Sequence, residues 1–137
     1  MKTGIKRALI IEDDPTSRLL LQEYLKGYGQ VDVAANGNKA VEAVSAALEA
    51  EKPYSLICLD IMMPELDGHE ALRKIRALED EMGVWDTYRA RVVMTTALLS
   101  DAKNTSAAYR SVCDAYLPKP IDKARLLEIL RQLNLIT

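Results

Sequence analysis

Polar side chains stand directly after the short apolar runs of this sequence. They are Glu12, Asp13 and Asp14 after the run 8–11, Asp60 after 56–59, Thr95 and Thr96 in the run that begins at residue 91, and Lys119 after 115–117. A group of carboxylates without a cysteine or histidine partner is typical of a Mg²⁺ site. A cation, a lysine and a hydroxyl around one carboxylate favour phosphoryl transfer onto it, because they neutralise the transferred charge. Asp60, alone at the end of "SLICLD", is the candidate nucleophile, and we expect it to be exposed there.

These side chains meet only if the fold brings the ends of the apolar runs together. The runs 8–11, 31–34, 56–60, 91–95 and 115–117 are predicted strands, and amphipathic helical stretches separate them. Strands separated by helices pair in parallel, with helices on both faces. The sequence therefore predicts an α/β fold, a doubly wound five-stranded parallel sheet. Ligands of such sheets bind at the carboxyl ends of the strands, where the polar residues stand.

The helical stretches have their own sequence signals. Asp14 is the expected N-cap of the first helix, with Pro15 at its first position. An Ala-rich stretch predicts a helix from about residue 101 to 111. The other helices are predicted from their apolar faces: Val41, Val44 and Leu48; Leu72, Ile75 and Leu78; and Leu126, Leu127, Leu130 and Leu133.

Composition excludes several classes of protein. The chain has 137 residues, enough for one domain, and a net charge of −2, which gives no reason to bind nucleic acid. The sequence contains no apolar stretch of about 18 residues, so we expect no membrane span. Cys58 and Cys113 form no CxxC pair and are interpreted as reduced core thiols of a cytoplasmic protein.

The chain resembles the receiver domain of two-component response regulators, the CheY-like family. The resemblance rests on four motifs in the family's order, "LIIEDDP", "LICLDIMMPELDG", "VVMTTA" and "YLPKP". It covers almost the whole chain, and it implies one receiver domain over residues 1–137 with a core from about 6 to 133. The implied fold is the flavodoxin-like (βα)5 sandwich with strand order 2-1-3-4-5.

The resemblance also implies a role for each matching residue. Asp60 is the phosphoacceptor, and Mg²⁺ is held by Asp13, by Glu12 through water, by Asp60 and by the backbone carbonyl of Met62. Thr96 is the switch hydroxyl, Lys119 pairs with the phosphoryl group, and Tyr116 is the aromatic that moves on activation. The Lys119-Pro120 bond is expected to be cis.

Three positions depart from the family pattern. Glu12 stands where Asp is commoner in the family. Ile121 stands where an aromatic residue often follows the Lys-Pro pair. The segment Leu78–Arg91 is longer than usual and holds Trp85 and Tyr88. We interpret both rings as a cover for the sheet's edge, with docking of a partner as the alternative. His69, the only histidine, is interpreted as an incidental surface residue.

The expected function is a Mg²⁺-dependent phosphoacceptor switch. Its partners would be a sensor histidine kinase or a histidine phosphotransfer protein, a downstream protein target and, when phosphorylated, a second copy. The expected output face combines the helix near 101–111, which includes Tyr109 and Arg110, the strand 115–117 and the closing helix. We expect no turnover of an external substrate.

Three other functions are compatible with parts of this pattern. A phosphorylation-independent adaptor with the same fold stays open. An Asp-nucleophile phosphatase would need a second Asp two residues after Asp60, where Met62 stands. A flavodoxin-like or nucleotide-binding module would need a Gly- or Ser/Thr-rich first loop, whereas "EDDPTS" places three acids there, which repel phosphate unless a metal intervenes.

Overall fold

The computed structural model describes residues 5–61, 68–85, 89–96 and 113–136. They contain a five-stranded parallel sheet in the order β2-β1-β3-β4-β5. Its strands are β1 (Arg7–Ile11), β2 (Gln30–Ala34), β3 (Leu56–Asp60), β4 (Arg91–Thr96) and β5 (Ala115–Pro118). The class and the strand order predicted from the sequence are confirmed, and the strand bounds differ from prediction by one residue at most.

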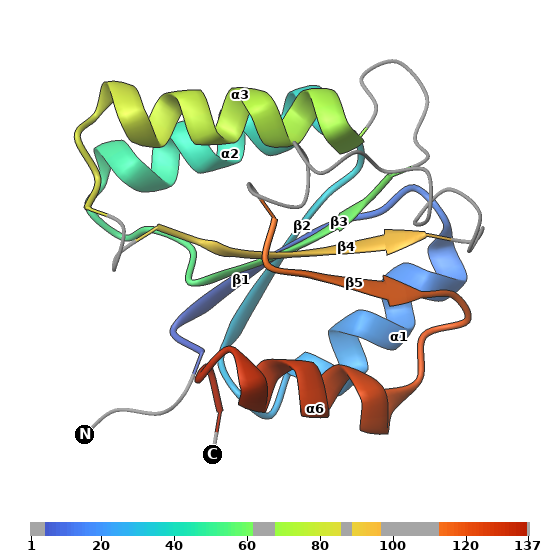
Figure 1. Ribbon diagram of the computed structural model, residues 1–137. Coiled ribbons are helices and arrows are strands. Elements are labelled where there is room, and N and C mark those ends of the chain that lie inside the picture. The colour runs from blue at the N-terminus through green and yellow to red at the C-terminus, as the bar shows by residue number, and fades with distance from the viewer. Residues whose placement is uncertain (1–4, 62–67, 86–88, 97–112, 137) are drawn as a thin grey trace.

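Four helices in this described part cover both faces of the sheet. They are α1 (Pro15–Leu25), α2 (Gly37–Glu49), α3 (Gly68–Glu81) and α6 (Lys123–Gln132). In Figure 1, α2 and α3 lie on one face, and α1 and α6 on the other. The helix predicted near 101–111, with Tyr109 and Arg110, lies outside the described residues.

Each face of the sheet has its own hydrophobic core. Ala40 and Val44 of α2 pack with Leu72 and Ile75 of α3 on the first face. Leu21 and Leu25 of α1 pack with the closing helix α6 on the second. Strand β3 lies in the middle of the sheet, and all five of its residues are buried. A parallel strand covered on both faces needs such a continuous apolar run. Asp60, which ends this strand, is its only charged residue.

The buried stripe of α2 differs from the predicted one. Ala40, Val44 and Ala47 are fully buried, whereas Val41 and Leu48 are only partly buried at its margins. The prediction placed the larger apolar side chains at the centre of the contact because they are more hydrophobic. Alanines at the centre instead let the helix lie closer to the sheet.

Several local expectations are confirmed. Asp14 caps α1 by accepting hydrogen bonds from the Ser17 amide (3.2 Å) and the Ser17 hydroxyl (2.8 Å). The Lys119-Pro120 peptide bond is cis. Cys58 and Cys113 are free and buried, and burial raises the pKa of Cys58 to about 12. Within the described ranges, no helix is long and apolar enough to cross a membrane.

Candidate functional site at the carboxyl edge of the sheet

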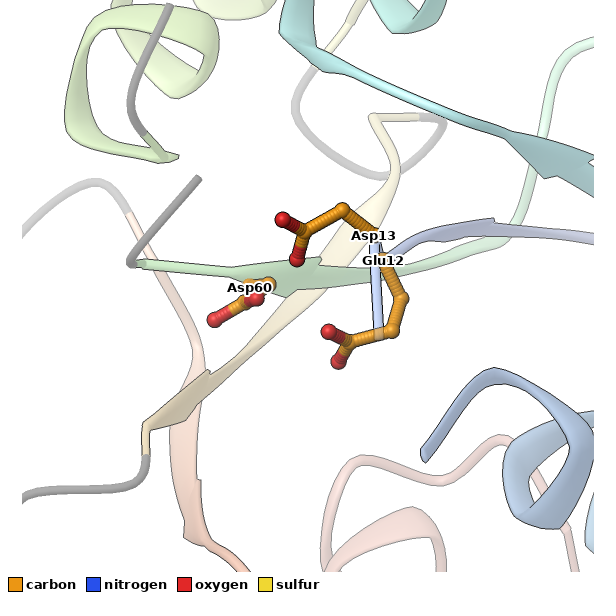
Figure 2. Close-up of side chains that lie close together, drawn as sticks. All are labelled: Glu12, Asp13 and Asp60. Atoms are coloured by element: carbon orange, nitrogen blue, oxygen red, sulfur yellow. The ribbon is translucent and has the colours of Figure 1, made fainter. Parts of the chain in front are cut away.

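Three carboxylates meet where β1 and β3 end. Oxygen atoms of Glu12, Asp13 and Asp60 lie within 4.8 Å of one another, and Figure 2 shows the three side chains gathered beyond the strand ends. Ile11 pairs with Leu59 in the parallel register of β1 and β3, so the next residues along these two segments, Glu12 and Asp60, emerge side by side. The predicted convergence of the acids is confirmed.

Asp60 is buried, with 2% of its surface exposed, so the expectation of an exposed carboxylate was wrong. Strand β3 lies between β1 and β4, and its neighbours enclose its end. Glu12 is also buried, whereas Asp13 is exposed. An incoming group therefore meets Asp13 at the surface and Asp60 beneath it.

Lys119 joins the two buried acids. Its Nζ lies 3.0 Å from Glu12 Oε2 and 3.4 Å from Asp60 Oδ2, and its side chain is 15% exposed. Burial by itself lowers the pKa of Lys119, but the hydrogen bond and charge of Glu12 and the charge of Asp60 outweigh it and raise that pKa. The ammonium group thus stays charged and offsets part of the repulsion among the carboxylates.

Glu12 has one satisfied and one unsatisfied oxygen. Oε2 accepts hydrogen bonds from Lys119 Nζ at 3.0 Å and from the Asp14 amide at 3.2 Å. Oε1 is buried and has no hydrogen-bond partner among the described residues. An orphaned carboxylate oxygen inside an all-oxygen cluster fits a Mg²⁺ ion or one of its waters. Met62, whose carbonyl was the fourth predicted ligand, lies outside the described residues.

The end of β4 supplies the hydroxyl groups. Thr95 and Thr96 are both 1% exposed, and Thr95 pairs with Asp60 in the register of β3 and β4. The Lys119 amide donates a 2.7 Å hydrogen bond to the Thr96 carbonyl, which ties the lysine loop to β4. Tyr116 of β5 is half-buried against the core under α2 and α3, and its hydroxyl is buried. The fold therefore brings Thr96 and Lys119 to one edge, as expected.

Comparison with known proteins decides the family. A family model of the response regulator receiver domain matches residues 8–131. This chain belongs to that family. The domain therefore belongs to two-component signalling.

Similar proteins support this assignment. The receiver domain is 33% identical to the two-component response regulator ORR41 of Oryza sativa subsp. japonica, over 94% of both chains. Its fold is similar to that of the receiver domain of the histidine kinase CKI1 from Arabidopsis thaliana, complexed with Mg²⁺ and BeF₃⁻. The TM-score is 0.74 at 26% identity, with 95% of this chain and 97% of that one covered.

A second solved structure is the receiver domain of Ssk1 from Saccharomyces cerevisiae, in complex with the histidine phosphotransfer protein Ypd1. Its TM-score is 0.77 at 26% identity, with 96% of this chain and 90% of that chain covered. Several curated relatives are longer: the chain spans 50% of one, 31% of another and 13% of a third.

Gly68, the last residue of the motif "LICLDIMMPELDG", is a site residue to which the sequence analysis assigned no role. A Cβ at this position would lie 2.4 Å from the Asp60 carbonyl oxygen and 2.7 Å from Ile61 Cα. The Gly68 amide donates a 3.0 Å hydrogen bond to the Ile61 carbonyl. Glycine therefore lets α3 of the receiver domain begin directly against the end of β3. The "DG" pair was the available signal, but the close approach cannot be read from it.

The expectation for Trp85 is corrected, whereas Tyr88 cannot be compared with the structure. Trp85 is 75% exposed, so it does not cover the sheet's edge. Trp85 comes after α3, and the first residue of α3 lies against Asp60. Because α3 has 14 residues, it is about 20 Å long, and its last residue lies toward the amino edge of the sheet. Tyr88 lies outside the described residues. His69 is half-buried rather than on the surface.

Proposed function

We propose that this receiver domain is a phosphorylation switch whose phosphoacceptor is Asp60. One observation carries the proposal: the Lys119 ammonium bridges Asp60 and Glu12 while an orphaned Glu12 oxygen and Asp13 complete an acidic cluster. Asp60 is the acid at the centre of this arrangement, at the end of the middle strand. It is therefore the residue best placed to receive an anionic group.

The donor in this proposal is a phosphohistidine of a partner protein, or a small acyl phosphate. An Asp60 carboxylate oxygen attacks phosphorus and the new O–P bond forms. In a phosphohistidine the N–P bond breaks with its electron pair left on the imidazole nitrogen, and in an acyl phosphate the O–P bond breaks with the pair left on the departing carboxylate. Glu12, Asp13 and Asp60 would hold Mg²⁺, which supplies charge neutralisation for the phosphoryl oxygens. Lys119, 3.4 Å from Asp60, contributes a second positive charge.

The phosphoryl group then acts as a new charged centre. It adds about two negative charges and three acceptor oxygens, which attract the Lys119 ammonium and the Thr96 hydroxyl. Withdrawal of Thr96 toward Asp60 frees space in front of β4 for Tyr116. The switch face would include β5 and α6, and attack of water on the acyl phosphate would reset the domain without turnover of an external substrate.

Intact-mass spectrometry after incubation with acetyl phosphate tests the proposal. We expect a gain of about 80 Da, one HPO₃ unit, that requires both Mg²⁺ and Asp60. The Asp60→Asn variant should gain nothing. Asp80→Asn is the matched control, because this exposed carboxylate on α3 lies outside the cluster, and it should gain the same mass as the native chain.

The outcomes separate a switch from an adaptor. A modification that persists in Asp60→Asn would overturn the assignment of the phosphoacceptor. If no mass is gained, BeF₃⁻ with Mg²⁺ is added and backbone NMR spectra are recorded. Shifts around Asp60 and Lys119 would then support a short-lived phosphoryl group, whereas unchanged spectra would indicate a phosphorylation-independent adaptor. In pull-down assays, a histidine phosphotransfer protein should bind the native chain.

A further inference from the structure

A cavity lies at the edge of the sheet opposite to Asp60. It has a volume of about 620 Å³ and is lined by residues at or before the first residues of β1, β3 and β4, together with the segment after α6. Arg7 is the first residue of β1, Ser55 precedes β3, and Arg91 is the first residue of β4. In Figure 1 this is the edge away from the arrowheads. The phosphoacceptor site and this cavity therefore share the sheet but no residue.

The lining is strongly basic although the chain as a whole is slightly acidic. Five basic residues and one acid line the cavity, whereas the net charge of the protein is −2. A concentration of one sign of charge in a hollow attracts ligands of the opposite sign. The cavity thus favours an anion.

The basic residues fall into two groups. Three arginines have a carboxylate partner outside the lining, at N···O distances of 2.9, 2.5 and 3.6 Å: Arg7 with Asp32, Arg89 with Asp80, and Arg91 with Asp114. Lys6 and Lys52 are exposed, and neither makes an ion pair with any residue that the structure describes. The two lysines therefore have charge available for a ligand, while the arginines are held as part of the wall.

The uncharged part of the lining is mainly apolar, with Ser55 and Asn134 as its polar members, and it includes an aromatic ring. Pro53, Tyr54, Leu133 and Leu135 contribute to it. Tyr54 is 5% exposed, and the Arg7 guanidinium lies 4.4 Å from the centre of its ring. Its hydroxyl donates to Asp32, so the ring is anchored at both ends. Because the Tyr54 ring is almost fully covered, Pro53 and the two leucines are the apolar groups open to a ligand, and they suit an apolar body rather than a bare inorganic ion.

We propose that this cavity binds a small organic anion, one with a flat apolar body and a carboxylate, sulfonate or phosphate group. The body would lie against Pro53 and the leucines, and the charged group would lie between Lys6 and Lys52. The volume is within the range of about 300–1,000 Å³ that is usual for small-molecule pockets. A concave site of this size favours a small molecule over an acidic segment of a protein, which would need a larger and flatter contact area.

Backbone NMR titration of the full chain with naphthalene-1-sulfonate tests this. We expect saturable shifts at Lys6, Lys52–Ser55 and Leu133–Leu135, with smaller or no shifts at Asp60. Sodium sulfate, which has the charge without the ring, and 1-naphthalenemethanol, which has the ring without the charge, should each bind more weakly. Binding should also weaken with added NaCl, because the lysines are exposed.

Paired charge variants provide the decisive comparison. Lys6→Gln with Lys52→Gln should raise the dissociation constant of naphthalene-1-sulfonate by about fivefold or more, as expected for loss of two exposed ionic contacts. Lys74→Gln with Lys123→Gln, two exposed lysines on α3 and α6, changes the net charge equally and should leave the constant unchanged. Asp60→Asn should bind as the native chain does, which separates this site from the proposed switch.

Three results would overturn the inference. They are no saturation at millimolar naphthalene-1-sulfonate, an equal loss in both double variants, or shifts that map elsewhere. A glutamate-rich peptide that shifts the same residues when naphthalene-1-sulfonate does not would reassign the cavity to a protein partner.

Discussion

Asp32 shows how contacts of one residue decide its ionisation. Partial burial raises the pKa of its carboxyl group, but hydrogen bonds from the Tyr54 hydroxyl, the Arg7 guanidinium and the Gln30 amide outweigh burial and lower that pKa. The Tyr54 and Arg7 bonds are 2.8 and 2.9 Å long. Burial, then the hydrogen bond to Asp32, raises the pKa of Tyr54 to about 12. The tyrosine hydroxyl therefore remains a donor at neutral pH.

Asp32→Asn should lose stability at neutral pH but not in acid. A carboxyl group whose pKa is lowered in the folded state stabilises the fold above its unfolded pKa, here 3.8, and this contribution is lost as the pH falls through the folded value. Because the side chain is 36% exposed, solvent screening limits the expected loss at pH 7 to about 0.5 kcal/mol. Urea unfolding at several pH values, with Glu128→Gln as the exposed control, measures it. A native-minus-variant difference that stayed constant well below pH 3.8 would contradict the prediction.

At the scale of elements, the contact between the start of α3 and the end of β3 positions the site. Gly68 is buried and leaves no room for a Cβ beside the Asp60 carbonyl. The atoms in the way are backbone atoms, which cannot rotate aside as a side chain can. The geometry around Asp60 thus depends on a residue with no side chain.

Gly68→Ala should therefore displace α3 and impair the site. We expect a loss of about 1–3 kcal/mol in the free energy of unfolding, as for other overpacked positions, and slower phosphorylation by acetyl phosphate. Gly27→Ala is the matched control, because a Cβ there meets nothing within 4 Å. Equal behaviour of the two variants in urea unfolding would show that the close approach at Gly68 is unimportant.

The far end of α3 is tied to the sheet by a buried carboxylate. Glu79 is 2% exposed and accepts hydrogen bonds from Arg76 (2.8 Å) and from the Ala90 amide (3.0 Å). Arg76 also donates to the Ala90 carbonyl at 2.9 Å and contacts Asp114 at 3.4 Å. Asp114 in turn accepts from the Val92 amide at 2.7 Å. These contacts link the end of α3 to the starts of β4 and β5.

Removal of the Glu79 carboxylate should be costly. Glu79→Ala leaves the Ala90 amide without its acceptor and removes the buried carboxylate beside Arg76, which keeps the Ala90 carbonyl and Asp114, and we expect a loss of about 3 kcal/mol. Glu79→Gln keeps one acceptor oxygen and should lose less. The free energy of unfolding in urea measures both, and a Glu79→Ala variant as stable as the native chain would show that the network contributes nothing.

At the scale of the whole molecule, the two edges of the sheet have opposite character. Carboxylates gather at the carboxyl edge, and basic residues line the cavity at the amino edge. Among the described residues, only Lys119 brings a positive charge to within 4.0 Å of a carboxylate oxygen of the acidic cluster, while Arg18 donates a hydrogen bond to the Glu12 carbonyl at 3.3 Å. Repulsion within that cluster is therefore a cost of the folded state that a divalent cation would relieve.

Mg²⁺ should stabilise the whole fold through this cluster. With a dissociation constant of about 1 mM, about 10 mM Mg²⁺ would add about 1.4 kcal/mol to the free energy of unfolding. Asp13→Asn should abolish the response and, without Mg²⁺, should be at least as stable as the native chain because one repelling charge is gone. Thermal unfolding in MgCl₂ and in NaCl of equal ionic strength measures this. A Tm increase that Asp13→Asn retained would place the ion elsewhere.

Patterns local in the chain determined the architecture and the candidate residues. Apolar runs separated by amphipathic stretches were sufficient for the parallel sheet, and Asp14 before Pro15 was sufficient for the start of α1. The acids, the Thr95-Thr96 pair and Lys119 could be named because parallel strands must end at a common edge, whereas the choice of Thr96 within that pair was implied by the family resemblance. Those inferences need only periodicity and topology.

Only the tertiary structure decided how those residues are used. The burial of Asp60, the pairing of Lys119 with Glu12 and the carboxylate network of Glu79 depend on which strands and loops enclose each side chain. The contact at Gly68 and the cavity at the amino edge arise between segments far apart in the chain. A sequence pattern specifies the direction of a side chain within its own element, whereas burial and partners are set by packing between elements.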